Sequence, residues 1–367
     1  MTAPARTGDP ARRPASSRTG GPASSRPASD YSVLLDSIRS MGLLERRYAY
    51  YATRSLLLLS ALGTVAAGFV LIGDSWLQIA VAAVLAVVLT QVIFLGHDAA
   101  HRQVFVSARA NEIMAMILAS GLSGLSLAWW NTKHARHHQA PNQVGKDPDI
   151  EPGVVHFYPA EKPPTGTLGR FLHAHQGWWF FPLLAVEAIN LHVQSVAAVL
   201  ARRDMKHRRT EITLITGRLV LYPAVLFVVL SPARAVTFLL VQMVVTGVYL
   251  GSVFAPAHVG MPILGADAKM DFFRRQVLIS RNITGNRFTT WFMGGLNLQV
   301  EHHLFPNMPR PNLRRAQVVV QEFCVGRRVT YTEKTLGQAW VLIIGHMNRV
   351  GAAGRDPYAC PVVRQLR

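Results

Sequence analysis

WLQIAVAAVLAVVLTQVIFLGHDAAH, residues 76–101, is an apolar run that ends on a pair of histidines. Residues 76–96 contain no charged side chain, and about twenty apolar residues are enough to cross a bilayer as a helix. The run ends directly on His97, and His101 follows four residues later, so both side chains project from one face of a helix. The sequence therefore predicts a membrane-spanning helix that carries two metal-binding side chains to one surface of the membrane.

Three further runs have a similar length and composition. The chain is 50% hydrophobic and only 16% charged, which would leave too much apolar surface in water for a soluble fold. Short turns join these runs in pairs. We predict an all-α, polytopic membrane protein whose four transmembrane helices form two hairpins under a cytosolic helical cap. The expected spans are residues 55–73, 76–96, 212–230 and 235–257.

Three other segments are not expected to cross. Residues 113–130 are interrupted by serines and glycines, and a full crossing would place the histidines on either side of them on opposite faces of the membrane. Residues 178–201 carry Glu, Asn, His and Gln side chains that are costly inside a span, so we expect an interfacial helix there. Residues 31–54 mix apolar and basic side chains and predict another interfacial helix that leads into the first span.

The two ends of the chain differ in composition from the part between them. Residues 1–29 contain no Leu, Ile, Val or Phe, so we expect a disordered tail. We expect the membrane domain over residues 30–345 and a C-terminal tail over 346–367. Cys324 and Cys360 lack the CxxC spacing of a metal or redox site and are expected to be unpaired thiols.

The net charge of +18 could indicate nucleic acid binding, but the charges are unevenly placed. The hairpin turns contain only Asp74 and Arg234. Residues 97–211 carry twelve Lys/Arg against nine Asp/Glu, and residues 258–367 carry fifteen against six. Because cytosolic loops are enriched in Lys and Arg, we predict a multi-pass protein of the cell membrane, with both loops and both termini in the cytosol and no nucleic acid partner.

Three short clusters hold seven of the fourteen histidines: HDAAH at 97–101, HARHH at 134–138 and QVEHH at 299–303. The predicted topology places all three on one face of the membrane. Imidazole suits iron, zinc, copper or nickel. Seven histidines exceed one zinc site, and haem would need histidines facing each other inside the bundle. We therefore favour a di-iron centre that activates O2.

These clusters resemble the three histidine boxes of the integral-membrane fatty acyl desaturases. Neighbouring motifs extend the resemblance over about residues 35–345: WW at 129–130, PN at 141–142, DPDI at 147–150, GGLNLQ at 294–299 and HLFP at 303–306. The resemblance implies two Fe ions held by the box histidines and by one further histidine after the fourth span. The implied ligands are His97, His101, His134, His137, His138, His258, His302 and His303.

Gln299 opens the third box, where the commoner pattern has histidine. This resembles the front-end desaturases, which act between an existing double bond and the carboxyl end. Since an amide is a weaker ligand than imidazole, we expect Gln299 to hydrogen-bond beside the metal or to bind it weakly. Asp98 and Glu301 are expected to accept the free N–H of a coordinating imidazole. Asp147 and Asp149 either do the same or cap the proline-rich turn.

The resemblance implies O2-dependent introduction of a cis double bond into a fatty acyl chain carried by CoA (acyl-CoA), by acyl carrier protein (acyl-ACP) or by a membrane lipid. Trp129 and Trp130 either line the acyl channel or belong to an interfacial aromatic belt. Many front-end relatives carry a fused cytochrome b5 domain with a His-Pro-Gly-Gly motif, which this sequence lacks. We therefore expect a separate electron donor, such as a ferredoxin or a flavin reductase, on the basic cytosolic surface. The same basic residues could equally bind the phosphates of CoA.

Two alternatives stay open on the sequence alone. A di-iron hydroxylase or ketolase of a lipid or hydrocarbon would use the same ligands and differ only in its product. A membrane metal-binding or transport protein would need polar side chains along a path through the spans, and the spans contain few of them.

Overall fold

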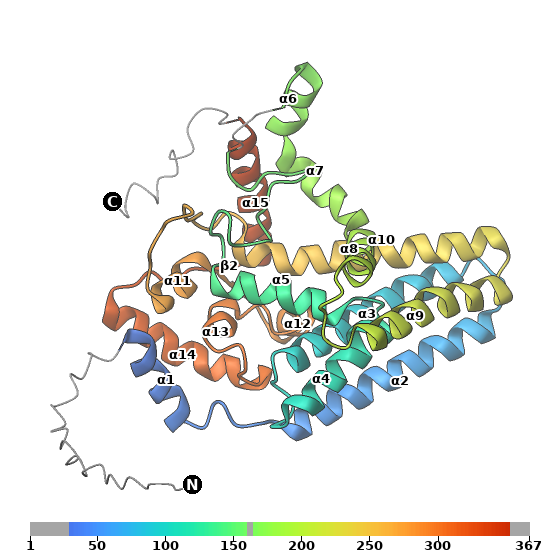
Figure 1. The fold of residues 1–367 in the computed structure, drawn as a ribbon, viewed down its shortest axis with the longest axis horizontal. Helices are drawn as coiled ribbons and strands as arrows, with labels where there is room; N and C mark the ends of the chain where they lie inside the picture. Colours follow the sequence, from blue (N-terminus) through green and yellow to red (C-terminus); the bar gives the residue numbers. More distant parts are fainter. Residues whose placement is uncertain (1–28, 160–163, 353–367) are drawn as a thin grey trace, which may run out of the picture.

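The computed structural model describes residues 29–159 and 164–352, and this part of the chain is mostly helical with very little strand (Figure 1). The strands β1 (Asn282–Thr284) and β2 (Glu333–Thr335) pair in parallel, with Asn282 opposite Glu333. The mostly helical class expected from the sequence is confirmed. The helices are α1 (Asp30–Ser40), α2 (Tyr48–Ile72), α3 (Gln78–Ala100), α4 (Ala108–Met116), η1 (Ile117–Leu122), α5 (Leu127–Gln139), α6 (Thr167–Ala174), α7 (Gln176–Leu183), η2 (Leu184–Val186), α8 (Glu187–Ala201), α9 (Arg208–Val229), α10 (Pro232–His258), α11 (Phe272–Ile279), α12 (Arg287–Phe292), α13 (Gln299–Leu304), α14 (Arg310–Arg327) and α15 (Leu336–Ala352).

The four expected spans are the long helices α2, α3, α9 and α10, which lie alongside one another (Figure 1). The most apolar windows of α3 and α10 are 56% and 44% buried, whereas those of α2 and α9 are only 6% and 11% buried. Helices α3 and α10 therefore form the packed interior of the bundle. Helices α2 and α9 present apolar side chains outward, as a bilayer requires. At the far end Asp74 pairs with Arg234 and accepts the backbone N–H of Ser231 at 2.9 Å, which joins the two hairpin turns.

The number of helices that cross a membrane is not fixed by length and composition. In the described chain five are long and apolar enough: the four above and Gln176–Ala201. A sixth candidate is the pair Ala108–Leu122 and Leu127–Gln139, which is bent by 113°. Such a bend allows the pair to enter the bilayer and return to the same side, as expected for residues 113–130. A count of four spans remains a prediction.

Serines and a glycine shape this bend. Ser120 and Ser123 donate to backbone carbonyls at the break, at 3.0 and 2.9 Å, which satisfies groups that lipid could not. Gly124 has a φ of +72°, a conformation that favours glycine. Ser126 then caps α5, and the buried carboxylate of Glu211 on α9 accepts the Ser126 hydroxyl and an α5 backbone N–H. Helix α5 is thereby aimed back toward the end of α3.

Beyond the histidine-bearing ends of α3 and α10 lies a separate core built from α1, α11, α13 and α14. Leu34 and Ile38 of α1 are fully buried in it. The single interfacial helix predicted over 31–54 is therefore wrong: α1 ends at Ser40, Gly42 has a φ of +64°, and the helix resumes only at Tyr48. The first segment packs on protein because its apolar side chains complete this core.

The predicted domain boundary at residue 345 falls inside α15, which continues to Ala352 and packs on α6 and α7. The folded part of the chain thus extends past the expected boundary. Within the described residues Cys324 is a free thiol, as predicted, and it is buried in the core of α1, α11, α13 and α14. The tail expected over residues 1–29 lies outside the described residues except for Ser29, which caps α1, and Cys360 lies outside them too.

Candidate metal centre

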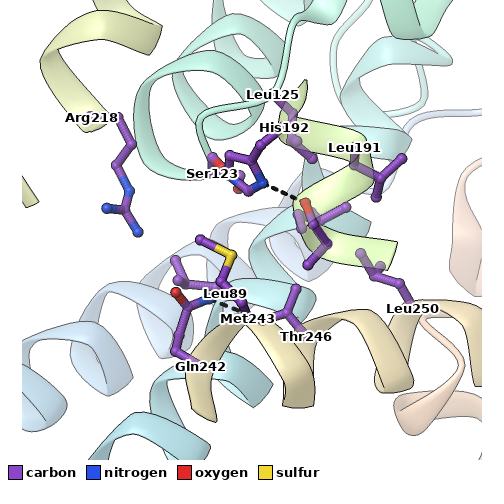
Figure 2. Close-up of a pocket in the computed structure, with 12 residues that line it drawn as sticks. Leu89, Ser123, Leu125, Leu191, His192, Arg218, Gln242, Met243, Thr246 and Leu250 are labelled. Carbon is purple, nitrogen blue, oxygen red and sulfur yellow. Dashed lines mark hydrogen bonds between the residues drawn. The ribbon is translucent and has the colours of Figure 1, made fainter. Parts of the chain in front are cut away.

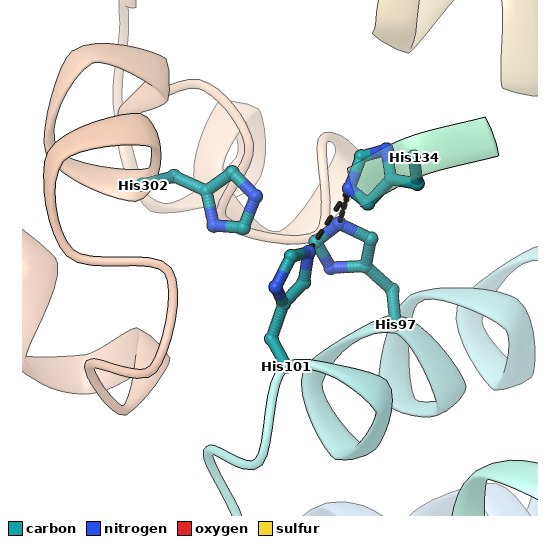
Figure 3. Close-up of side chains that lie close together, drawn as sticks. All are labelled: His97, His101, His134 and His302. Carbon is teal, nitrogen blue, oxygen red and sulfur yellow. Dashed lines mark hydrogen bonds between the residues drawn. The ribbon is translucent and has the colours of Figure 1, made fainter. Parts of the chain in front are cut away.

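Four helical segments bring the predicted ligands to one place: the end of α3, the C-terminal half of α5, the end of α10 and the short helix α13. Two groups made of histidines alone form there, and within each group one ligand atom per residue lies within 4.8 Å of the others. The first group consists of His97, His101, His134 and His302 (Figure 3). The second group consists of His137, His258 and His303.

In the first group the rings approach from α3, α5 and α13 (Figure 3). The Nε2 atom of His134 lies 3.3 Å from Nε2 of His97 and 2.9 Å from Nε2 of His101. The ring of His302 lies 4.9 and 4.8 Å from those two rings, and its Nε2 is buried with no hydrogen-bond partner in the described chain. The group is a convergent set of nitrogen donors.

In the second group the Nε2 atoms of His258 and His303 lie 3.1 Å apart. The ring of His137 is 4.7 and 5.1 Å from their rings. The Nε2 amide of Gln299 lies 3.0 Å from Nε2 of His258, so Gln299 belongs beside this group. Whether Gln299 binds a metal stays a prediction.

Each ring of the second group is held at its other nitrogen. His137 Nδ1 lies 3.0 Å from the carboxylate of Asp147, and His303 Nδ1 lies 2.9 Å from Oε1 of Gln276. His258 Nδ1 faces the backbone carbonyl of Ile279 at 3.3 Å. These acceptors require Nδ1 to carry the proton, so Nε2 is left with its lone pair. Sequence reasoning missed Gln276, because a single glutamine outside the boxes carries no distinguishing signal.

The donor set fits a bound cation. Because the Nε2 lone pairs of His258 and His303 face each other at 3.1 Å, they repel unless a cation lies between them. Burial lowers the pKa of His302 and His303 well below the usual value, so both rings are neutral, as a metal ligand must be. Two groups of imidazoles of this kind could hold two transition-metal ions.

His138 lies between the two groups. Its Nε2 is 3.0 Å from Nε2 of His134 in the first group, and its ring stacks on that of His303 in the second, with centroids 4.2 Å apart. Its Nδ1 is buried without a partner in the described chain. From this position His138 could act as a metal ligand in either group.

The predicted carboxylates behave differently from one another. Asp147 contacts the imidazole of His137 and also caps the turn, where its carboxylate accepts the N–H groups of Asn142 and Asp149. Asp98 Oδ1 is 3.8 Å from Nδ1 of His97, and its other oxygen pairs with Arg310 at 2.6 Å.

Glu301 does not accept from an imidazole within the described residues. Its oxygens accept instead from Tyr331 at 2.6 Å and from Asn282 at 2.7 Å. Burial raises the pKa of Glu301 to about 7. The expectation that it would orient a ligand is corrected, because adjacent side chains of a helix point about 100° apart, and that of Glu301 faces Asn282 of β1.

The two tryptophans also separate. Trp130 stacks on His134 with centroids 4.2 Å apart and lies 5.4 Å from the ring of His97. Trp129 packs among the apolar side chains of α8 and α9. Neither lines the two cavities described below, so the expected channel wall is not found there.

A small cavity of about 20 Å³ lies between α3, α8, α9 and α10 (Figure 2). Leu89 and Ile93 of α3 line it. Several polar side chains line it too, although few were expected within the spans. Gln242 donates to Thr246 at 3.0 Å, and Arg218 donates to the carbonyl that ends η1 at 2.8 Å. These polar groups thus have partners inside the bundle.

Apolar helical hairpins, with eight histidines gathered at one end of them by α3, α5, α10 and α13, fit a membrane protein with a histidine-rich metal centre. A family model described as fatty acid desaturase matches residues 74–335, and the chain belongs to this family, whose named members are oxidoreductases. It is 30% identical to the acyl-lipid (9-3)-desaturase of Borago officinalis, covering 72% of this chain and 61% of that protein. It is 28% identical to Delta(8)-fatty-acid desaturase 2 of Arabidopsis thaliana (79% and 67% covered) and to fatty acid desaturase 3 of Bos taurus (92% and 76% covered).

Proposed function

We propose that this protein introduces a cis double bond into a fatty acyl chain, using O2 and electrons from a separate donor. The observation that carries the proposal is the convergence of imidazole nitrogens into two buried groups in a chain of the fatty acid desaturase family. Two iron ions would be held there. When bound, they supply the activation of O2 that removes hydrogen from two adjacent methylene groups.

The histidines would divide between the two ions. The four of the first group would hold one ion, the three of the second group would hold the other, and His138 would join either. The acceptors behind the second group keep its rings in one tautomer and orientation, which raises their basicity as ligands. Gln299 would hydrogen-bond beside that group or bind weakly.

The acyl chain would run from the metals into the helices along one face of α3. Leu89 and Ile93 precede His97 by eight and four residues, so they lie on the same side of the helix. They line the small cavity between α3 and α10 together with Leu250. The cavity has room for about one water molecule, so the chain would have to displace these side chains as it enters. An acyl chain held along this face would present one fixed C–C bond to the metals, so the double-bond position would be set by geometry.

The excess of Lys and Arg in both large loops supports a cytosolic metal centre. An acidic ferredoxin or a flavin reductase would then dock on this basic surface and deliver electrons. The acyl chain would arrive as acyl-CoA, acyl-ACP or an intact membrane lipid.

Expression in a host with a defined fatty acid profile tests the proposal. Gas chromatography with mass spectrometry should find new unsaturated fatty acids, and His137→Ala should abolish them while the protein still inserts. His175→Ala is the matched control, because that exposed ring lies outside the two groups and its Nδ1 bonds the carbonyl of Phe171 on α6. An unchanged lipid profile with iron-loaded protein and a competent donor would overturn the proposal. A product carrying an added oxygen atom would favour the hydroxylase instead.

A further inference from the structure

A second cavity, of about 180 Å³, lies between α2 and α3 and reaches under α12 and α14. It lies on a different side of α3 from the ligands. Gln91, Leu95 and Asp98 line it, whereas Leu89 and Ile93 face the smaller cavity on the His97 side. Since Gln91 and Asp98 are two helical turns apart, they share one face of α3. The cavity is therefore separate from the path proposed for the substrate.

The lining changes from apolar to polar along the cavity. Leu57, Leu58 and Ala61 of α2 and Val88 of α3 form its apolar length. Leu57 is 58% exposed, so this length borders the surface that faces the bilayer. From Val88 to Asp98 the helix rises about 15 Å, which suits an extended hydrocarbon chain. The shape and polarity match an acyl chain with a polar head.

The polar end carries an excess of positive charge. Arg54 and Arg310 line it together with the single carboxylate of Asp98, which pairs with Arg310. In residues 29–159 and 164–352 Arg54 has no carboxylate partner, and its guanidinium lies 5.5 Å from the ring centroid of Tyr50. The Nε of Arg310 is buried without an acceptor in the same described ranges. The polar end of the cavity thus has one positive charge more than it has negative charges, which favours an anionic ligand group.

The level at which the polar end lies relative to the bilayer indicates that the ligand is a phospholipid. Arg54 stands immediately before the apolar run of α2, and Tyr50 lines the same end one turn earlier. Aromatic and basic side chains at this level are typical of the headgroup region of a bilayer. An arginine there meets a lipid phosphate as a charge-assisted hydrogen-bond partner.

We propose that this cavity binds one acyl chain of an anionic phospholipid from the leaflet at the histidine-bearing end, with its phosphate on Arg54. The site does not depend on the proposed reaction. It touches the metal centre only through Asp98, whose carboxylate lies 3.8 Å from His97 Nδ1. A lipid bound there would fill the space beside that pair and hold α2 against α3.

Native mass spectrometry of the full chain tests this proposal after exchange into detergent with phosphatidylglycerol or phosphatidylcholine. The wild type should retain one phosphatidylglycerol per chain and be stabilised by it against heat. Arg54→Gln should weaken that retention about tenfold or more, as expected when a charge-assisted contact is lost. Ala61→Phe should block retention by filling the apolar length. Arg209→Gln, an exposed arginine that begins another span, is the matched control and should behave as wild type.

Metal content of each variant shows whether the fold is intact, because neither substituted residue is a proposed ligand. Equal retention of phosphatidylglycerol by wild type and Arg54→Gln would overturn the proposal. So would equal retention of phosphatidylcholine, or retention of a free fatty acid in place of the phospholipid. Since none of these readouts requires turnover, their failure is distinguishable from failure of the desaturase proposal.

Discussion

Replacing Asp147 by asparagine should weaken metal binding at the second group of histidines. One carboxylate oxygen accepts the N–H of Asn142 at 2.7 Å, the other accepts the N–H of Asp149 at 2.9 Å, and His137 Nδ1 lies within 3.1 Å of both. An asparagine offers one acceptor oxygen only. Whichever way the amide is turned, its NH2 group faces an N–H donor, and the charge that favours the Nδ1–H tautomer is lost.

Loss of an acceptor behind a metal-binding histidine costs about ten- to hundredfold in metal affinity, or about 1.4 to 2.7 kcal/mol. Elemental analysis and competition with a chelator would measure this on purified protein. Wild type should hold two irons per chain and Asp147→Asn about one, since the first group keeps its ligands. Glu151→Gln, which alters an exposed pair with Arg136 nearby, is the control. Wild-type iron content and affinity in Asp147→Asn, or equal loss of both irons, would refute the reasoning.

Three further predictions follow from packing and burial. Gly247→Ala should lower the Tm, because a Cβ there would lie 2.3 Å from a backbone carbonyl of η2, while Gly63→Ala, with open space around it, should not; equal Tm values would contradict this. Burial raises the pKa of Cys324 to about 12. In a Cys360→Ser background, iodoacetamide at pH 8 should therefore label Cys324 roughly a hundredfold or more slowly than a small free thiol in water. Labelling at the rate of the free thiol would be inconsistent with the buried site. Arg281→Gln should lower the Tm and the iron content together, because the buried guanidinium donates to the carbonyls that end α10 beside the second group; unchanged iron content would argue against this positioning role.

Hydropathy and histidine spacing were sufficient to predict the two hairpins and the gathering of ligands at one end. An uncharged run of bilayer length leaves little choice of structure, and histidines one helical turn apart must share a face. His258 was reached through the family resemblance, and it does lie 3.1 Å from His303.

The supporting contacts could not be predicted from the sequence. Gln276 and Arg281 act through single long-range contacts, and no spacing distinguishes them from other polar residues. Glu301 was misassigned because adjacency to His302 says nothing about where its side chain points. The break after Ser40 depends on burial of Leu34 and Ile38 against α14, a tertiary effect that overrides the local helical pattern.

The number and identity of the metals test the central claim most directly. Protein expressed with iron and purified without chelators should hold two irons per chain by elemental analysis, with a Mössbauer spectrum of histidine-ligated, non-haem iron. His303→Ala should reduce this to about one. A single metal in the wild type, or zinc in place of iron after iron loading, would contradict the account.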